Sequence, residues 1–418
     1  MEHSIQDRIE GALWGLFVAD SLAMPIHWYY NRKNITSDFP GGVTQFEAPR
    51  HPHPEAFMIG MRYRPDVETA QKLGRPYDIL HDHARFYDST YSDMGFSLSD
   101  REGSHGNAVA AADERYHYHH GLNAGDNTVA AHLVRVLMRQ IADAGRYDPV
   151  RFVNAMVSFL TTPGLNRDPY TEIYLRRWFE NYSRGADPLS AAEHQRNVWS
   201  IGSHGGMIRP MVLSMLISND ATLATGVALD HQVITHRSEI VSSALSVSVP
   251  LLHDLLRGME IREAVASSAP RIRMPSLNGR ELFAEYRNND GPGNISKDRM
   301  WHIHMDRSEA RFDPASLAED PGTDQVVMGA FATACYPEHG LPLAMFHAWN
   351  NTERPFEALI ADANAGGDNV HRGMVLGLRV GAADPKALRE RGKDLCDADD
   401  IHGEIAAFAE LCGSDSAY

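Results

Sequence analysis

Cysteine is scarce in this chain of 418 residues, which contains only Cys335, Cys396 and Cys412. They are widely spaced and no two form a CxxC motif, which argues against a thiolate zinc site and against a disulfide framework. Residues 1–10 also lack a basic segment followed by an apolar run, so we expect no signal peptide. Free thiols are typical of a reducing compartment, and we therefore expect a cytoplasmic protein.

Positive charge is also in short supply. The sequence has 39 Lys and Arg against 55 Asp and Glu, which gives a formal net charge of −16. Nonspecific binding to nucleic acid depends on clustered Lys and Arg, so we expect no nucleic-acid partner. An uninterrupted apolar run of about 18 residues is missing as well, so we expect no association with a membrane. The composition indicates a soluble globular protein and sets no oligomeric state.

Apolar residues recur at helical spacing along most of the chain. Between Asp7 and Asp20 they occupy positions 9, 13, 16 and 17, a pattern typical of a helix with one buried face. No segment alternates apolar and polar residues among β-branched neighbours, so we predict an all-α fold. Pro250 should end or kink its helix, because proline removes a backbone donor. Similar stripes occur at residues 128–141, 150–160, 207–217, 240–256, 326–335, 355–363 and 374–380.

Residues 41–107 interrupt this pattern. They are rich in Pro, Gly, His, Asp and Tyr and are only weakly periodic. A loop of this length inside a compact domain is usually functional or disordered, and its aromatic residues argue against disorder. We predict one domain over residues 1–418, in which residues 41–107 form a long insertion that walls one side of a cleft.

Four short segments between the helical stripes contain residue types that enzymes use for chemistry. In residues 19–28, Asp20 and His27 lie seven residues apart where a helix ends. Asp126 opens the next helix, and a simple N-cap is an equally good interpretation for it. Two glycines precede Asp368, and they permit close approach of the backbone to a ligand. The remaining segment comprises residues 204–210, followed later by Thr235 and His236.

In this order the four segments resemble the motifs of the ADP-ribosylglycohydrolase family, over about residues 5–382. The resemblance implies an orthogonal multi-helix bundle with a central acidic cleft. Residues 24–28 and 366–373 further resemble the crystallin-like branch of that family. The family's G-x-x-x-G-D-A-L-G-x-P-x-E is similar to residues 11–27, its T-D-D-T to Gly125-Asp126-Asn127-Thr128, its G-N-G-x-x-M-R-x-x-P and T-H to residues 204–210 and 235–236, and its G-G-D-T-D-T to residues 366–371.

The departures from the family pattern concern its metal ligands. Typical members bind two magnesium ions through the Glu of the first motif, the T-D-D triplet and the final D-x-D-T. Of these acids, the resemblance carries over only Asp126 and Asp368. Magnesium prefers oxygen ligands, so the changes disfavour a two-magnesium site. One divalent ion near Asp126 and Asp368, magnesium or a transition metal, is one alternative, and a metal-free carboxylate–histidine site is the other. The replaced positions are His27, Gly125, Asn127, Val370 and His371.

The resemblance implies a hydrolase that cleaves an N-glycosidic (ribosyl) bond in an ADP-ribosylated or small ribosylated substrate. Such cleavage needs a carboxylate to activate water and groups that hold the sugar. A catalytically inactive binding or structural member of the same fold is the alternative. The replacements are not all inert, because the site gains His27, Asn127, Asn369 and His371, and this favours the enzyme. The implied catalytic residues are Asp126, Asp368 and His27, and the implied substrate-binding residues are Asp20, Asn127, Thr128, Gly367, Asn369 and His371.

Overall fold

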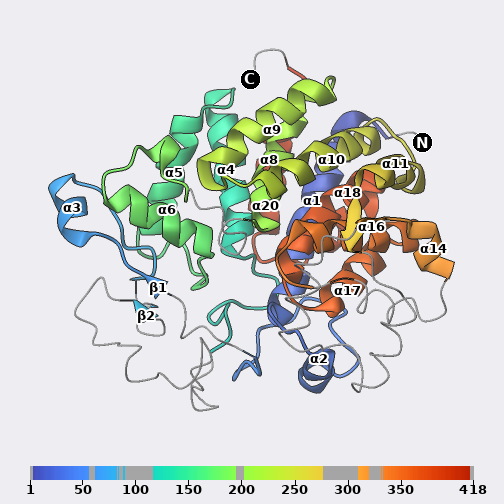
Figure 1. Cartoon of the computed structure of the whole chain (residues 1–418), viewed down its shortest axis with the longest axis horizontal. Helices are drawn as coiled ribbons and strands as arrows, with labels where there is room; N and C mark the ends of the chain where they lie inside the picture. Colours follow the sequence, from blue (N-terminus) through green and yellow to red (C-terminus); the bar gives the residue numbers. More distant parts are fainter. Residues whose placement is uncertain are drawn as a thin grey trace.

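The computed structural model of the chain describes residues 3–55, 62–81, 83, 88–89, 116–193, 202–275, 309–319, 331 and 333–414. Helices dominate this described part, which confirms the all-α prediction (Figure 1). Strands are limited there to two short ladders, the parallel pair β1 (Arg62–Tyr63) and β2 (Asp88–Ser89) and the antiparallel pair β3 (Arg273–Pro275) and β4 (Glu309–Arg311).

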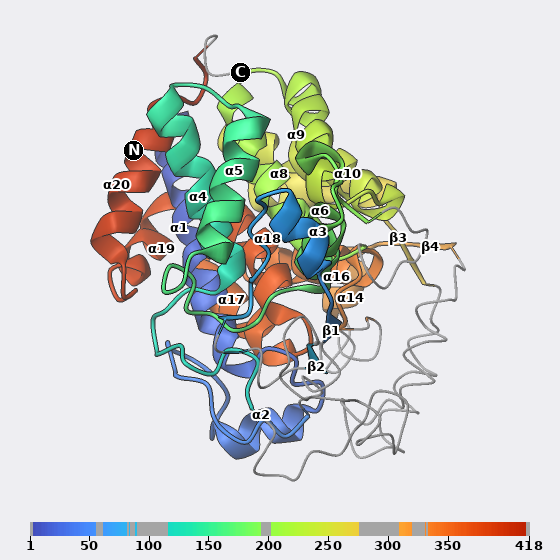
Figure 2. The ribbon, with the colours of Figure 1, turned by 90° about the vertical axis from the view of Figure 1, so that its left-hand side faces the viewer.

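The N-terminal helix α1 (Ile5–Ala23) lies at the centre of the bundle (Figure 1). A capping box starts it, because the Ser4 hydroxyl accepts from the Asp7 amide while the Asp7 carboxylate accepts from the Ser4 amide. Every residue from Gly11 to Ala23 is buried, so the helix has no solvent-facing side along this length. It runs against α18 (Asn369–Ala383), and the two helices lie side by side inside the molecule (Figures 1 and 2).

Glycines allow α1 and α18 to touch through their backbones. A Cβ atom placed on Gly15 would lie 2.1 Å from the carbonyl oxygen of Gly377, and one placed on Gly377 would lie 2.1 Å from that of Gly15. Gly11 and Gly381 meet in the same way, at 2.4 and 2.1 Å. Because α1 precedes His27 and α18 follows Asp368, this contact fixes the spacing of two candidate site residues.

The other helices surround this pair. Five of these helices follow predicted stripes within a few residues, namely those at 128–141, 150–160, 207–217, 240–256 and 355–363. The described end of the stripe at 326–335, residues 333–335, is not helical, and residues 326–330 and 332 lie outside the described part. The helices are α2 (Arg32–Asp38), α3 (Val67–Lys72), α4 (Val129–Ala144), α5 (Pro149–Thr161), α6 (Ile173–Ser183), α8 (Gly205–Ser214), α9 (Ala221–Thr235), α10 (Glu239–Leu256), α11 (Ile261–Ser268), α14 (Pro314–Glu319), α16 (Pro337–Asn350), α17 (Pro355–Ala365), α19 (Pro385–Gly392) and α20 (Ala398–Ala409), with short 3-10 turns at Met24–Ile26, Pro188–Ser190, Met215–Ile217 and Ala269–Arg271.

Helix α10 continues through Pro250 to Leu256, so Pro250 does not end it, and a kink there stays a prediction. A proline has no N–H to donate to the carbonyl oxygen four residues earlier in a helix. For Pro250 this is the carbonyl oxygen of Ser246. The Arg271 side chain donates to that oxygen at 2.6 Å. The tertiary contact therefore replaces the hydrogen bond that the proline removes.

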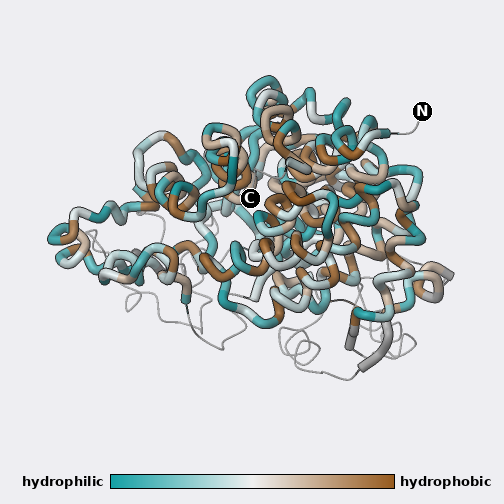
Figure 3. Tube along the Cα trace, turned by 90° about the horizontal axis from the view of Figure 1, so that it is seen from above, coloured by the Kyte–Doolittle hydropathy of each residue, from teal (hydrophilic) through white to brown (hydrophobic). Residues whose placement is uncertain are grey.

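The segment Ile5–Ile26 and helix α10 are long and apolar enough to cross a membrane by length and composition. Within their most apolar windows, however, 94% and 61% of the residues are buried inside the protein. Apolar stretches of the chain run through the middle of the bundle, and hydrophilic ones are frequent at its outer turns (Figure 3). Packing in the core therefore accounts for the apolar character of both helices.

The described parts of the insertion contact two places near the candidate site. The His53 ring bonds to the carbonyl oxygen of His27 at 3.0 Å, and Glu55 accepts from the amides of Tyr30 and Asn31 at 2.9 Å. Residues 62–81, which contain the short helix α3, pack against α6. Residues 56–61, 82, 84–87 and 90–107 lie outside the described part, and the cleft wall stays a prediction.

Candidate active site

Two glycines place Asp368 in the interior, between α17 and α18. Gly366 and Gly367 have φ of 75° and 68°, in the left-handed region that favours glycine. A Cβ on Gly367 would lie 1.9 Å from the carbonyl oxygen of Thr333, and one on Gly366 would lie 2.2 Å from that of Tyr29. The loop is therefore pressed against two segments, the one that follows α1 and the one that precedes α16, where the carbonyl oxygen of Thr333 accepts from the Asp368 amide at 2.8 Å.

The same contact holds His27. The Trp28 amide donates to the carbonyl oxygen of Gly367 at 2.8 Å. Trp28 itself has a φ of 67°, which is uncommon for a bulky residue and is found mainly where the surroundings enforce it. Its ring stacks on that of His27, with ring centroids 4.8 Å apart. The backbone of this turn thus directs the His27 side chain toward Asp368.

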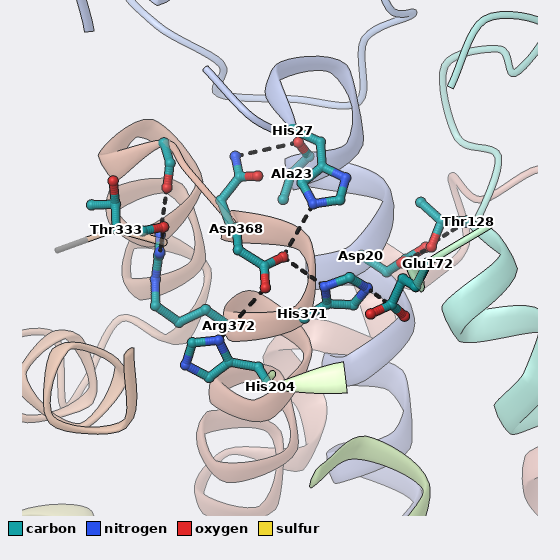
Figure 4. Close-up of polar contacts among 12 residues, drawn as sticks. Asp20, Ala23, His27, Thr128, Glu172, His204, Thr333, Asp368, His371 and Arg372 are labelled. Atoms are coloured by element: carbon teal, nitrogen blue, oxygen red, sulfur yellow. Dashed lines mark hydrogen bonds and ion pairs between the residues drawn. The ribbon is translucent and has the colours of Figure 1, made fainter. Parts of the chain in front are cut away.

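His27 and His371 converge on the carboxylate of Asp368 (Figure 4). Oδ1 of Asp368 lies 3.1 Å from Nε2 of His27 and 2.6 Å from Nδ1 of His371, which is one turn further along the chain. All three side chains are buried. Burial opposes ionisation of Asp368, but His371, His204 and His27 outweigh it and hold the pKa of this carboxyl well below its usual range.

The two imidazoles have opposite pKa shifts. Burial lowers the pKa of His27 to about 3, although Asp368 partly offsets this effect. For His371, burial also opposes the charged form, but Asp368 and Glu172 together raise its pKa well above the usual value. Separated pKa values within one cluster are typical of a functional site rather than of a structural one.

Each imidazole has a second partner on its other ring nitrogen. Nδ1 of His27 lies 2.7 Å from Nε2 of His119, whose Nδ1 lies 2.9 Å from Asp168. Nε2 of His371 lies 3.1 Å from Oε1 of Glu172. The six residues form a continuous buried row, which we call the carboxylate–histidine chain. In order along the row it consists of Asp168, His119, His27, Asp368, His371 and Glu172.

Three members of this chain were not singled out from the sequence. His119 belongs to a histidine-rich segment, and Asp168 and Glu172 lie four residues apart in the loop that leads into α6. Asp168 also accepts from the amides of Val129 and Tyr170, at 2.8 and 3.0 Å. No short motif links these positions, and only the close spacing of Asp168 and Glu172 could have drawn attention to them.

A fourth histidine, His204, approaches Asp368 from the third sequence segment. Its Nδ1 lies 3.6 Å from Oδ2 of Asp368, which is too far for a hydrogen bond. Within the described residues, neither this oxygen nor either ring nitrogen of His204 has a hydrogen-bond partner. The His204 ring packs closely on α16, where a Cβ on Gly340 would lie 1.8 Å from its Nε2. Nδ1 of His204 and Oδ2 of Asp368, neither of which has a hydrogen-bond partner within the described residues, therefore face each other beside the centre of the carboxylate–histidine chain.

Asp20, Asn127 and Thr128 meet at the start of α4. The Asp20 carboxylate accepts from the Thr128 hydroxyl at 2.6 Å, from its amide at 2.7 Å and from the Asn127 side chain at 2.8 Å. Burial raises the pKa of Asp20, against the effect of these hydrogen bonds. The three residues join α1 to α4, and their contact with a substrate stays a prediction.

Asp126 and Asn369 have partners of their own. Asp126 accepts from the Asn123 amide at 2.8 Å and from Arg167 at 2.9 Å. No hydrogen bond or ion pair joins it to Asp368 among the residues that the structure describes, and its catalytic and metal-binding roles stay predictions. The Asn369 side chain donates to the carbonyl oxygen of Ala363 at 2.9 Å, which ties α18 to the end of α17.

Comparison with known proteins decides the family. The profile of the ADP-ribosylglycohydrolase family matches residues 1–417. This chain belongs to the ADP-ribosylglycohydrolase family. A solved structure described as an "ADP-ribosylglycohydrolase-related protein complex" covers 98% of this chain and 99% of its own, with a TM-score of 0.54 and 16% identity, which supports the fold alone. A search among curated proteins finds no match. The resemblance is thereby confirmed, and the crystallin-like branch stays a prediction.

The donor set of this family member does not fit the two magnesium ions of typical members. Val370 is buried and has no donor atom, and the Asn127 amide donates to Asp20. His27 and His371 offer nitrogen, whereas magnesium requires oxygen in a near-ideal octahedron. One donor atom each from His27, Asp368 and His371 lie within 4.8 Å of one another. The cluster therefore fits a single divalent ion.

Proposed function

We propose that this chain is a hydrolase that cleaves an N-glycosidic bond to a ribosyl group, in an ADP-ribosylated or a small ribosylated substrate. Membership of the ADP-ribosylglycohydrolase family supports a glycohydrolase of the ADP-ribosyl type. The observation that carries the proposal is the carboxylate–histidine chain, three members of which, His27, Asp368 and His371, occupy positions where the family pattern has its ligands. We further propose that the enzyme acts in the cytoplasm, without a nucleic-acid or membrane partner.

Breaking a bond from ribose to nitrogen builds positive charge on the sugar, and the reaction needs a base for the attacking water. We assign the charge-stabilising role to Asp368, which is ionised and fully buried. Glu172 is the more accessible carboxylate, since its side chain is 7% exposed and those of Asp368 and Asp168 are 0% exposed. It is therefore the better candidate to take the proton from water.

The remaining chain members orient these groups. Asp168 holds His119, and His119 holds His27, so the ring of His27 has a fixed orientation. We propose that Asp126 contacts the sugar diol. The side chain of its ion-pair partner Arg167 is 60% exposed, and an exposed ion pair contributes little to stability, so a structural role does not account for Asp126. A divalent ion on His27, Asp368 and His371, when bound, would polarise an oxygen of the substrate or of water.

The alternative is an inactive member that only binds a ligand. Burying an ionised group costs several kcal/mol when it is unpaired, and the chain buries three carboxylates beside three imidazoles. A decayed site has no reason to keep such an arrangement paired from end to end. We therefore favour the enzyme.

The test is a turnover assay with purified full-length protein. Peptides ADP-ribosylated on arginine or serine and a panel of small N-ribosides would be incubated with it, and released ADP-ribose or ribose quantified by chromatography with mass detection. Asp368→Asn and Glu172→Gln should lower turnover by about 100-fold or more. Asp143→Asn, the same change on the exposed face of α4, should not. Binding of a panel member without turnover would support the inactive alternative.

A further inference from the structure

The carboxylate–histidine chain contains more hydrogen-bond links than protons to fill them. A neutral imidazole has one N–H, and an ionised carboxylate has none. Three imidazoles therefore supply three protons. The chain has five links: four hydrogen bonds of 2.9, 2.7, 3.1 and 2.6 Å from Asp168 to His371, and an ion-pair contact of 3.1 Å between His371 and Glu172. Two links must hold a pair of facing lone pairs unless something else occupies them.

Protonating the imidazole rings further does not fill these links without placing two like charges close together. One added proton on His371 fills both of its links, but the three links from Asp168 to Asp368 then still share two protons. A second added proton, on His27, would create two cationic rings whose centroids are 5.4 Å apart in a buried site. Like charges at this distance repel strongly where water is excluded.

We propose that the carboxylate–histidine chain binds one transition-metal ion through Nε2 of His27, the carboxylate of Asp368 and Nδ1 of His371. The three donor atoms already lie within 4.8 Å of one another. An ion at this point occupies the two links to Asp368, and three N–H groups remain for the three other links. Every ring is then neutral and every link is filled.

The rest of the chain fits this assignment. His119 donates to Asp168, His27 donates to His119, and His371 donates to Glu172. A metal-binding histidine almost always donates its other N–H to a carboxylate or similar acceptor, which fixes the ring and increases its basicity. Both proposed ligands have this arrangement, His27 through His119 and His371 directly.

The atoms without hydrogen-bond partners point to the same place. Within the described residues, Oδ2 of Asp368 and Nδ1 of His204 lack such partners and lie 3.6 Å apart. Buried polar atoms are nearly always paired, so orphans at one point indicate a ligand. A small shift of either side chain would bring His204 to the ion as a fourth ligand. Imidazole with carboxylate suits zinc or iron(II) rather than magnesium.

Metal content of the full-length protein tests the inference without any substrate. The protein would be purified without a histidine tag or added metal and analysed by mass spectrometry for bound elements. It would then be stripped with chelator and titrated with Zn²⁺, with Co²⁺ followed by its visible absorption, and with Mg²⁺. We expect about one equivalent of Zn²⁺ or Co²⁺ per chain, undisturbed by millimolar Mg²⁺. Two equivalents of Mg²⁺ with no transition metal, or no binding of any of the three ions, would overturn it.

Matched variants locate the ion. His27→Asn and His371→Asn should abolish binding, whereas His402→Asn, on the exposed face of α20, should leave it unchanged. If the first two do not fold, Glu172→Gln decides the matter: affinity weakened by about 10–100-fold supports the site, and unchanged affinity overturns it. The inference concerns the proposed active site but stands apart from its activity. A metal-loaded protein that turns over no substrate would count against the proposed function and would leave this inference intact.

Discussion

Substituting Gly377 by alanine should destabilise the protein, although the same change stabilises most helices. Gly377 lies inside α18, where alanine has the higher helix propensity by about 1 kcal/mol. Its new methyl group, however, would lie 2.1 Å from the backbone oxygen of Gly15. Ordinary contacts at a Cβ begin at 3.4 Å, so α1 and α18 must separate by about the difference, 1.3 Å.

Overpacking a close-packed interior costs about 1–3 kcal/mol and occasionally more. Gly377→Ala should be at the upper end of this range, because the obstacle is the backbone of a central helix rather than a flexible side chain. After subtracting the propensity gain, we expect a net loss of about 1–2 kcal/mol or more. The separation also moves Asp368 away from His27, so the variant should bind Co²⁺ more weakly than the wild type.

Two glycines elsewhere in the chain provide matched controls. Gly226 in α9 and Gly403 in α20 are exposed, lie inside helices and have nothing within 4 Å of a built Cβ. Their alanine variants should be more stable than the wild type by about 0.5–1 kcal/mol. Thermal and urea midpoints of all three variants, measured at one pH, give the signs directly. A Gly377→Ala protein at least as stable as the wild type would refute the backbone contact between α1 and α18.

Two further predictions concern buried ionisable groups. Asp362→Asn should lower the free energy of unfolding by about 3–5 kcal/mol, because Asp362 pairs with the fully buried Arg372 at 2.7 Å and its loss leaves that cation unpaired; a urea midpoint equal to that of Asp143→Asn would contradict this. Burial and Asp126 raise the pKa of the exposed Cys396, so less thiolate forms at pH 8. Peptide-level alkylation with iodoacetamide should therefore be slower there than for free cysteine and faster in Asp126→Asn, and an unchanged rate would show that Asp126 does not act on the thiol.

The sequence was sufficient for the all-α class and for helices such as α1, α4 and α5, because their signals are local. The stripe between Asp7 and Asp20 predicted α1, and its start at Ile5 follows from the capping box at Ser4. The course of α10 beyond Pro250 was not predictable in the same way. It depends on Arg271, which is 21 residues further along the chain and reaches the orphaned carbonyl only in the folded protein. Helix propensity describes the free-energy cost of Pro250 inside α10, and the tertiary hydrogen bond from Arg271 offsets that cost.

The site residues show the same difference between local sequence signals and tertiary structure. Asp368, His27 and His371 could be selected from the sequence because they occupy motif positions, and the structure brings them together. His119, Asp168 and Glu172 stand in loops without a motif, so their roles depend on how the chain returns to one point. Of the motif acids, Asp126 has its own partners, and the three-residue donor group contains His371 where the sequence favoured Asp126.

The replacements at the family's ligand positions form a consistent set rather than a series of losses. Each histidine gained there brings a second ring nitrogen into a buried site, where an unpaired polar atom costs about 1–3 kcal/mol. The four ring nitrogens of His27 and His371 all have a partner within 3.1 Å, and these partners come from three different segments of the chain. Random decay of a magnesium site would not supply His119 and Glu172 at hydrogen-bond distance from the two new imidazoles.

His204, whose ring nitrogens have no hydrogen-bond partner in the described part of the chain, shows what an imidazole without such support looks like in the same site. The contrast between these rings argues that the carboxylate–histidine chain is arranged to hold a ligand at Asp368, and that nitrogen donors contribute to binding it.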